Sequence, residues 1–185
     1  MLRNSDKDWG AVAKSFHWLF AAIIFAQFAL GKIAEEMSVS PQKLELFVWH
    51  KSIGVTVLLL AFLRLAWRLT DAPPRLATAR ARWEHLAAKT SHSLLYMLMI
   101  AVPLSGWWIS DTSRIPFKAF WLVPVPDFLA ADKAASQAAE SVHGFLTAAL
   151  LALIVVHVAA ALRHHFILRN DTLRRMLPSR RREQV

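Results

Sequence analysis

The sequence predicts an all-α fold, an integral-membrane bundle of four antiparallel helices in one domain spanning residues 1–185. Three observations lead to this prediction. The chain is 56% hydrophobic and only 19% charged, and its mean hydropathy is +0.35. Its apolar residues stand in four long blocks, with the charged residues in the gaps. Each block has the roughly 20 residues that a helix needs to cross a bilayer core, and none shows the alternation typical of barrel strands.

The four expected helices differ in their flanking residues. The first is too long and too rich in aromatic residues for a cleaved secretory signal, so we expect it to be retained. The second has an uncharged centre and is stopped by Pro73 and Pro74, because proline cannot continue a helix. The fourth is the most uniformly apolar. The expected helices cover about residues 12–33, 46–69, 90–110 and 142–162.

The basic residues are unevenly distributed over this topology. Of the 22 Lys and Arg, 16 fall in the two terminal tails and the connection between the second and third helices, adjoining helix ends included; the other two loops hold 6. Because cytoplasmic loops of membrane proteins are enriched in Lys and Arg, we expect both termini in the cytoplasm. The formal net charge of +9 therefore indicates orientation and contact with anionic lipid, and we expect no nucleic-acid partner.

Two of the eight histidines share a face of the fourth helix. His143 and His157 are fourteen residues apart, so both project from one side with a rise of about 21 Å between them. Histidine inside a membrane helix is costly enough to indicate function. One metal ion cannot bind both rings, whereas two stacked large cofactors can.

Histidines on the other helices lie at the same two depths. His50 is level with His143 near the outer surface, while His17 and His92 are both level with His157 near the cytoplasmic surface. Two bis-imidazole sites are therefore predicted, of the kind that bind haem iron. The alternative is that these rings only form hydrogen bonds between helices. The absence of cysteine excludes disulfides, thiolate metal sites and covalently attached c-type haem.

The order of motifs along the chain resembles the bacterial cytochrome b561 family, of the short four-helix, di-haem type. Each motif is short, but the ordered set extends over nearly the whole chain. The matching residues are Phe16–Leu19, His50 with Gly54, Arg64–Arg68 followed by Pro73–Pro74, His92–Tyr96, Pro103–Trp107, His143 with His157, and His164–His165 leading to Arg169–Pro178.

This resemblance implies two non-covalent haems b in a bacterial inner-membrane protein. His17 and His157 would bind the cytoplasmic haem iron, and His50 and His143 the periplasmic one. The resemblance, and not the spacing, favours His17 over His92. It also implies electron transfer to the quinone pool, with ubiquinone as the expected substrate. Some family members are proposed to oxidise superoxide at the outer face, so the chain is either an electron carrier or a quinone-linked oxidoreductase of superoxide:ubiquinone type.

Cationic side chains and the remaining histidines have secondary roles in this interpretation. Arg64 shares a face with His50 at cytoplasmic depth, where its guanidinium could pair with haem propionates; plain snorkelling to the interface is the alternative. Lys51 could do the same at the outer haem, and a small anionic donor would be attracted there by Lys43, Lys51, Arg114 and Lys118. His92 is interpreted as structural or as part of a quinone or proton site. Interfacial positions are expected for His85, His164 and His165.

Two other functions remain compatible with the sequence. The chain could be the haem b membrane-anchor subunit of a larger hydrogenase or dehydrogenase, with a soluble redox protein as its partner. It could also be a haem-free transporter that moves a metal ion or protons along a histidine-lined path. The sequence indicates neither the physiological donor nor an oligomeric state.

Overall fold

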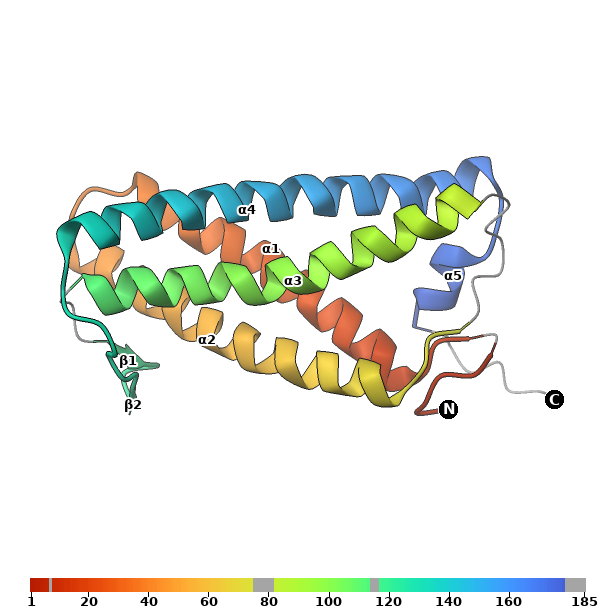
Figure 1. Cartoon of the computed structure of the whole chain (residues 1–185), viewed down its shortest axis with the longest axis horizontal. Helices are drawn as coiled ribbons and strands as arrows, with labels where there is room; N and C mark the ends of the chain where they lie inside the picture. The colour runs from red at the N-terminus through yellow and green to blue at the C-terminus, as the bar shows by residue number, and fades with distance from the viewer. Residues whose placement is uncertain (7, 75–81, 114–116, 179–185) are drawn as a thin grey trace.

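The computed structural model describes residues 1–6, 8–74, 82–113 and 117–178, and its long helices form an elongated bundle (Figure 1). Four helices in these ranges are long and apolar enough to cross a membrane, with mean hydropathies of 1.5 to 2.5. The predicted all-α membrane bundle is confirmed. The helices are α1 (Ala11–Glu36), α2 (Pro41–Thr70), α3 (Arg82–Thr112) and α4 (Lys133–Leu162).

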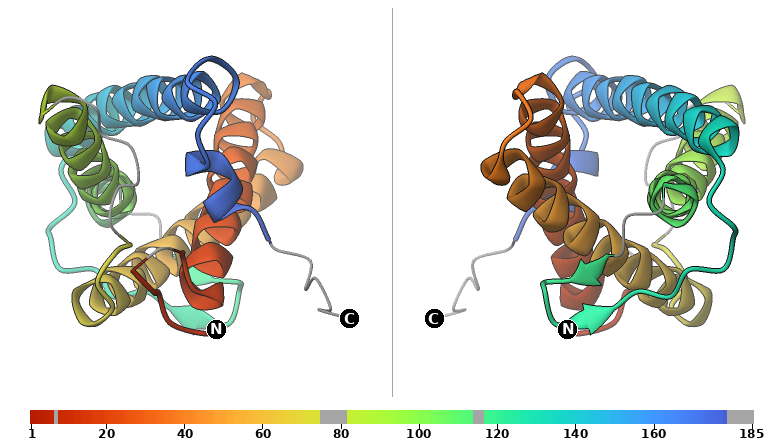
Figure 2. Two further views of the ribbon diagram at one scale, coloured as in Figure 1. Left: turned by 90° about the vertical axis from the view of Figure 1, so that its right-hand side faces the viewer. Right: turned by 90° about the vertical axis from the view of Figure 1, so that its left-hand side faces the viewer.

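Successive helices run in opposite directions, so both chain termini lie at one end of the bundle (Figure 1). We call this the terminal end. A small hairpin of β1 (Lys118–Ala119) and β2 (Val123–Pro124) lies at the other end, the hairpin end. Seen end-on in Figure 2, α3, α4, α1 and α2 follow one another around four sides. Close packing joins α3 to α4 and α2, and α1 to α2, whereas α1 and α4 do not pack closely along their length.

The helices extend beyond the apolar blocks, most clearly in α4, which begins nine residues before position 142. Polar caps explain the early starts. The Ser40 hydroxyl accepts a hydrogen bond from the Lys43 N–H at the start of α2, and the Asp132 carboxylate accepts two from backbone N–H groups at the start of α4. Such side chains satisfy the first N–H groups of a helix. Capped polar turns therefore lengthen the helices without adding apolar residues.

The buried core lies between the two predicted histidine depths. Phe20, Val57, Ala61 and Met99 form it, with partly buried residues of α1, α2 and α3 around them. Many other large apolar side chains remain exposed, as expected for helix faces that contact lipid. The core therefore separates the two ends of the bundle with apolar side chains.

The N-terminal segment is attached to the terminal end. Asn4 binds the end of α2, because its backbone N–H donates to the Asp71 carboxylate (3.1 Å) and its amide to the Ala72 carbonyl (3.1 Å). The Asn4 side-chain oxygen also accepts from the N–H of Gly10 (2.8 Å), just before α1. This one residue fixes the entry of α1 against the exit of α2.

The C-terminal segment folds back onto the same end. A π-helical turn, η1 (Arg163–Ile167), continues α4, and the short α5 (Thr172–Met176) follows it. The Trp18 indole N–H donates to the Met176 carbonyl (2.9 Å), which ties α5 to α1. Several basic residues counted in the sequence lie outside the described residues, namely Lys7, Arg75, Arg80, Arg114 and Arg180–Arg182.

The hairpin end is covered by the connection between α3 and α4. The N–H of Phe120 donates to the Ser52 hydroxyl (2.7 Å), and the Phe120 and Trp121 rings pack on Trp49. Further along, the Asp111 carboxylate accepts from two backbone N–H groups of the connection (2.7 and 3.2 Å). The connection is therefore attached to both α2 and α3.

Candidate functional site

Two histidines face each other at the hairpin end. The ring centroids of His50, from α2, and His143, from α4, are 6.4 Å apart, and the ring planes cross at 86°. We call them the hairpin-end pair. Sequence spacing put these two residues at one depth, and the structure brings their rings together from helices on different sides of the bundle.

Contacts with α3 determine which nitrogen of His143 is free to bind a metal. Its Nδ1 lies 3.1 Å from the carbonyl oxygen of Val102 and 2.9 Å from the hydroxyl of Ser105. A carbonyl oxygen can only accept, so Nδ1 carries the proton and donates it. The lone pair is therefore on Nε2, in the arrangement that metal-binding histidines adopt.

His50 is held through its backbone rather than through its ring. The Gln27 amide of α1 donates to the His50 carbonyl oxygen (2.8 Å). The His50 Nδ1 is buried, and no residue in the described part of the chain forms a hydrogen bond with it. The sequence prediction does not include Gln27, and it includes Ser105 only as part of the Pro103–Trp107 motif. The available signal was a polar side chain in an apolar helix close to a histidine depth.

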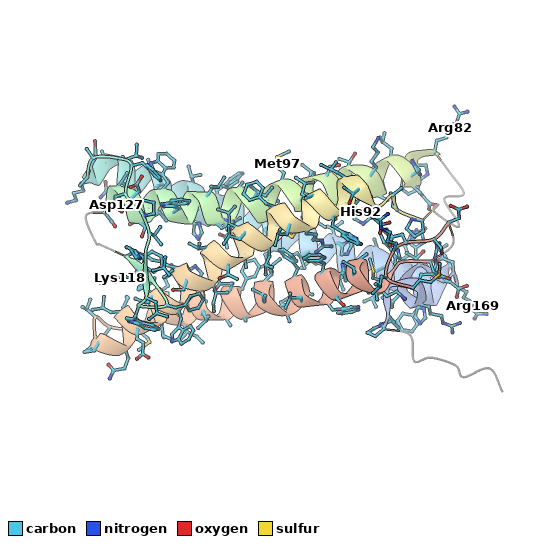
Figure 3. The ribbon with its side chains drawn as sticks, turned by 90° about the horizontal axis from the view of Figure 1, so that it is seen from below. Arg82, His92, Met97, Lys118, Asp127 and Arg169 are labelled. Carbon is cyan, nitrogen blue, oxygen red and sulfur yellow. The ribbon has the colours of Figure 1, made fainter. Side chains whose placement is uncertain are left out.

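Three histidine rings meet toward the terminal end. His157 of α4 lies 6.1 Å from His17 of α1 and 5.6 Å from His92 of α3, measured between ring centroids. Figure 3 shows His92 toward this end, far from Lys118 and Asp127 at the hairpin end. We call these three residues the terminal-end cluster. The structure brings both His17 and His92 to His157, so these distances alone do not select a partner.

Two arginines of α2 lie beside the terminal-end cluster. The Arg64 guanidinium lies over the Phe20 ring (5.1 Å) and the Tyr96 ring (5.4 Å). It interacts electrostatically with all three histidine rings. Arg68 interacts with His92, and its buried Nη1 has no hydrogen-bond partner among the described residues. Both cations are therefore available to an anionic group placed next to the rings.

These donor sets fit haem better than a bare metal ion. Two imidazoles that bind one metal atom from opposite sides have ring centroids roughly 6 Å apart, since each bonding nitrogen lies about 2 Å from the metal. The spacings of 6.1 and 6.4 Å agree with this geometry. Within the described ranges, no group of three or more His, Cys, Asp or Glu side chains could hold a metal ion. The unpaired Arg68 nitrogen suits a carboxylate such as a haem propionate.

The predicted cations at the hairpin end differ in their surroundings. The Lys51 ammonium donates to the Ser110 hydroxyl (2.9 Å) and lies 5.6 Å from the centre of the Phe117 ring. No ion pair found in the described ranges includes Lys51. Lys43 donates to the carbonyl of Met37 (2.7 Å). Lys118 is exposed, and Arg114 lies outside the described residues.

The other three histidines are not among the paired rings. His164, in η1, accepts a hydrogen bond from the Asn170 amide (2.8 Å). The ring of His165 packs on Phe166, and His85 is exposed near the start of α3.

Comparisons with known proteins point to one family. Residues 8–179 match the family described as prokaryotic cytochrome b561. "Cytochrome b561 homolog 2" of Escherichia coli (strain K12) is 35% identical over 181 residues, which cover 94% of this chain and 93% of that protein. "Cytochrome b561 homolog 1" of the same organism is 29% identical over 132 residues, or 71% of this chain and 74% of that protein. "Probable superoxide oxidase CybB" of Yersinia pestis is 25% identical over 175 residues, or 95% and 98%.

Proposed function

The chain belongs to the prokaryotic cytochrome b561 family, and from this we propose that it moves electrons across the bacterial inner membrane on two haems b. The family implies haem b and membrane electron transfer. The number of haems and their ligands are our proposal. The observation that carries it is the meeting of histidine rings at two depths, with centroid spacings of 6.1 and 6.4 Å.

The ligands we propose are His50 and His143 at the hairpin end, and His17 and His157 at the terminal end. The motif around His17 supports that residue over His92. Each haem would supply one-electron chemistry at its iron. The two imidazoles of each pair would hold the iron, and the protein would supply no open site there for a further ligand.

The apolar residues between the two sites would exclude water from the electron path. His143 and His157 are separated by a rise of about 21 Å along α4, and Val57 and Met99 belong to the buried core that fills this interval. Two haems held by these pairs would therefore divide electron transfer across the membrane into shorter steps. Arg64 and Arg68 would pair with propionates at the terminal end.

We propose that the terminal end faces the cytoplasm, because the tails and the α2–α3 connection carry most of the Lys and Arg. The hairpin end would then face the periplasm. The α3–α4 connection covers the hairpin end, and this favours a small electron donor over a protein that docks there. The Lys51 ammonium, beside His50 and without a carboxylate partner in the described chain, favours an anion. One relative is named as a probable superoxide oxidase, and we propose superoxide as donor and ubiquinone as acceptor.

Stopped-flow reduction of the purified holoprotein tests the donor. We expect superoxide to reduce the haem of wild type quickly, and Lys51→Gln to slow this step severalfold at low ionic strength, since a nearby cation raises the local concentration of an anion. Lys133→Gln, at an exposed position at the start of α4, is the matched control and should react like wild type. Rapid reduction by ubiquinol together with no reaction toward superoxide would contradict the proposed donor.

Substitution of His17 and His92 tests the terminal-end ligands. His17→Ala should lose the terminal-end haem and retain the other, whereas His92→Ala should retain both in the visible spectrum. The reverse result would assign the ligand role to His92.

A further inference from the structure

We propose, on the basis of the haem ligation inferred above, that Gly31 of α1 and Gly106 of α3 are positioning residues that set the ring planes of the hairpin-end pair. Neither helix carries a ligand for this site. Each instead presents a glycine to the imidazole of a ligand helix, so that the ring lies directly against helix backbone.

The contacts leave less room than a Cβ atom ordinarily has. A Cβ atom added at Gly31 would lie 3.1 Å from Cε1 and 3.4 Å from Nδ1 of His50. At Gly106 it would lie 3.3 Å from Cε1 and 3.5 Å from Nδ1 of His143. Carbon atoms in favourable contact are about 3.5–4.0 Å apart. Even one methyl group would therefore push either ring by a few tenths of an ångström.

Each glycine has a polar residue of the same helix beside it that holds the same histidine. Gln27, one turn before Gly31, donates to the His50 carbonyl. Ser105, directly before Gly106, contacts Nδ1 of His143. One contact fixes the position of the ligand, and the glycine limits the rotation of its ring. α1 therefore acts on His50 in the same way as α3 acts on His143.

This arrangement is specific to the hairpin end. The rings there cross at 86°, against 50° and 64° for the two contacts of His157. No terminal-end ring is among the nearest neighbours of a Cβ added at any of the chain's five glycines. A glycine next to a histidine in sequence is not enough, because a Cβ at Gly144, the neighbour of His143, would meet nothing within 4 Å.

The test compares three alanine variants of the holoprotein, Gly31→Ala, Gly106→Ala and Gly144→Ala. Alanine favours the helix over glycine by about 1 kcal/mol, so all three should fold. The readouts are the low-spin ferric EPR signals, which depend on the angle between the planes of the two bound imidazoles, and the two midpoint potentials. We expect Gly31→Ala and Gly106→Ala to move the EPR signal and potential of one haem only. Gly144→Ala should match wild type.

Two outcomes would overturn the inference: signals identical to wild type in both Gly31→Ala and Gly106→Ala, or equal changes in Gly144→Ala. Selective loss of the hairpin-end haem in the first two variants would support it, whereas loss of both haems would contradict a local effect. The variants His50→Ala and His143→Ala separate an error in the proposed haem ligands from an error in the positioning role of the glycines. If either variant keeps both haems, the ligand assignment fails; if both lose one haem and the glycine variants are unchanged, only the positioning role fails.

Discussion

The backbone carbonyl of Val102 determines which ring nitrogen of His143 can bind a metal. The oxygen of Val102 accepts the Nδ1 proton and leaves Nε2 for a metal, while the Ser105 hydroxyl donates to the same carbonyl (2.7 Å). A hydrogen bond to the second nitrogen of a ligand histidine raises the basicity of the ring. The environment of a single imidazole is thus a means of adjusting the potential of the haem that it would bind.

Ser105→Ala tests this effect. The substitution removes one acceptor from Nδ1, so the imidazole becomes a weaker electron donor and the midpoint potential of the hairpin-end haem should rise. The terminal-end haem should keep its potential. Redox titration followed in the visible spectrum measures both. Ser141→Ala is the control, because among the described residues the Ser141 hydroxyl donates to the Gln137 carbonyl and forms no other hydrogen bond. A shift of the terminal-end haem alone would disagree with the proposed contact.

Arg64 should act on the other haem. Removing a cation beside the terminal-end rings destabilises the added electron, so Arg64→Ala should lower that haem's midpoint potential. Coulomb's law at an effective dielectric constant of about 20 gives about 1–2 kcal/mol for unit charges roughly 8–15 Å apart. Arg82→Ala, at an exposed position on α3, is the control in the same titration. Two unchanged potentials in Arg64→Ala would remove Arg64 from the site.

At the scale of the elements, the four helices could be predicted because apolar blocks of spanning length specify them directly. The ends of the helices could not be predicted from the apolar blocks, because a polar capping residue such as Asp132 lies outside them. The spacing of His50, His143 and His157 predicted rings at two depths. The contacts of Gln27 and Ser105 were beyond prediction, because they depend on helix rotation and separation, and α3 contains Pro103 in its interior, a residue that bends helices.

The α3–α4 connection should depend on Asp111. This carboxylate is 7% exposed and accepts the N–H groups of Phe128 and Leu129. Asp111→Ala removes the acceptor of both N–H groups, and because Phe128 and Leu129 are exposed, water can replace part of each bond. We expect the free energy of unfolding to fall by about 0.5–1.5 kcal/mol per hydrogen bond. Thermal unfolding in detergent should show a lower Tm than in Asp127→Ala, at an exposed site of the same connection. Equal Tm values in the two variants would show that Asp111 does not hold the connection.

On the scale of the whole molecule, the distribution of basic residues gives the bundle a direction, and the positions of the histidines give it two sites. Basic residues gather at the terminal end, and histidine rings meet at two levels of the same bundle. Family membership favours haem b over the haem-free transporter, which the sequence had left open. The choice between His17 and His92 still comes from the motif around His17, because three helices converge on His157 and their ring distances differ little.

The ratio of haem to polypeptide in the purified protein tests the central claim most directly. A pyridine haemochrome assay against the protein concentration should give two haems b per wild-type chain, and one in His143→Ala, since that variant removes a ligand from the hairpin-end site only. A ratio of one in wild type, or an unchanged ratio in His143→Ala, would contradict the account.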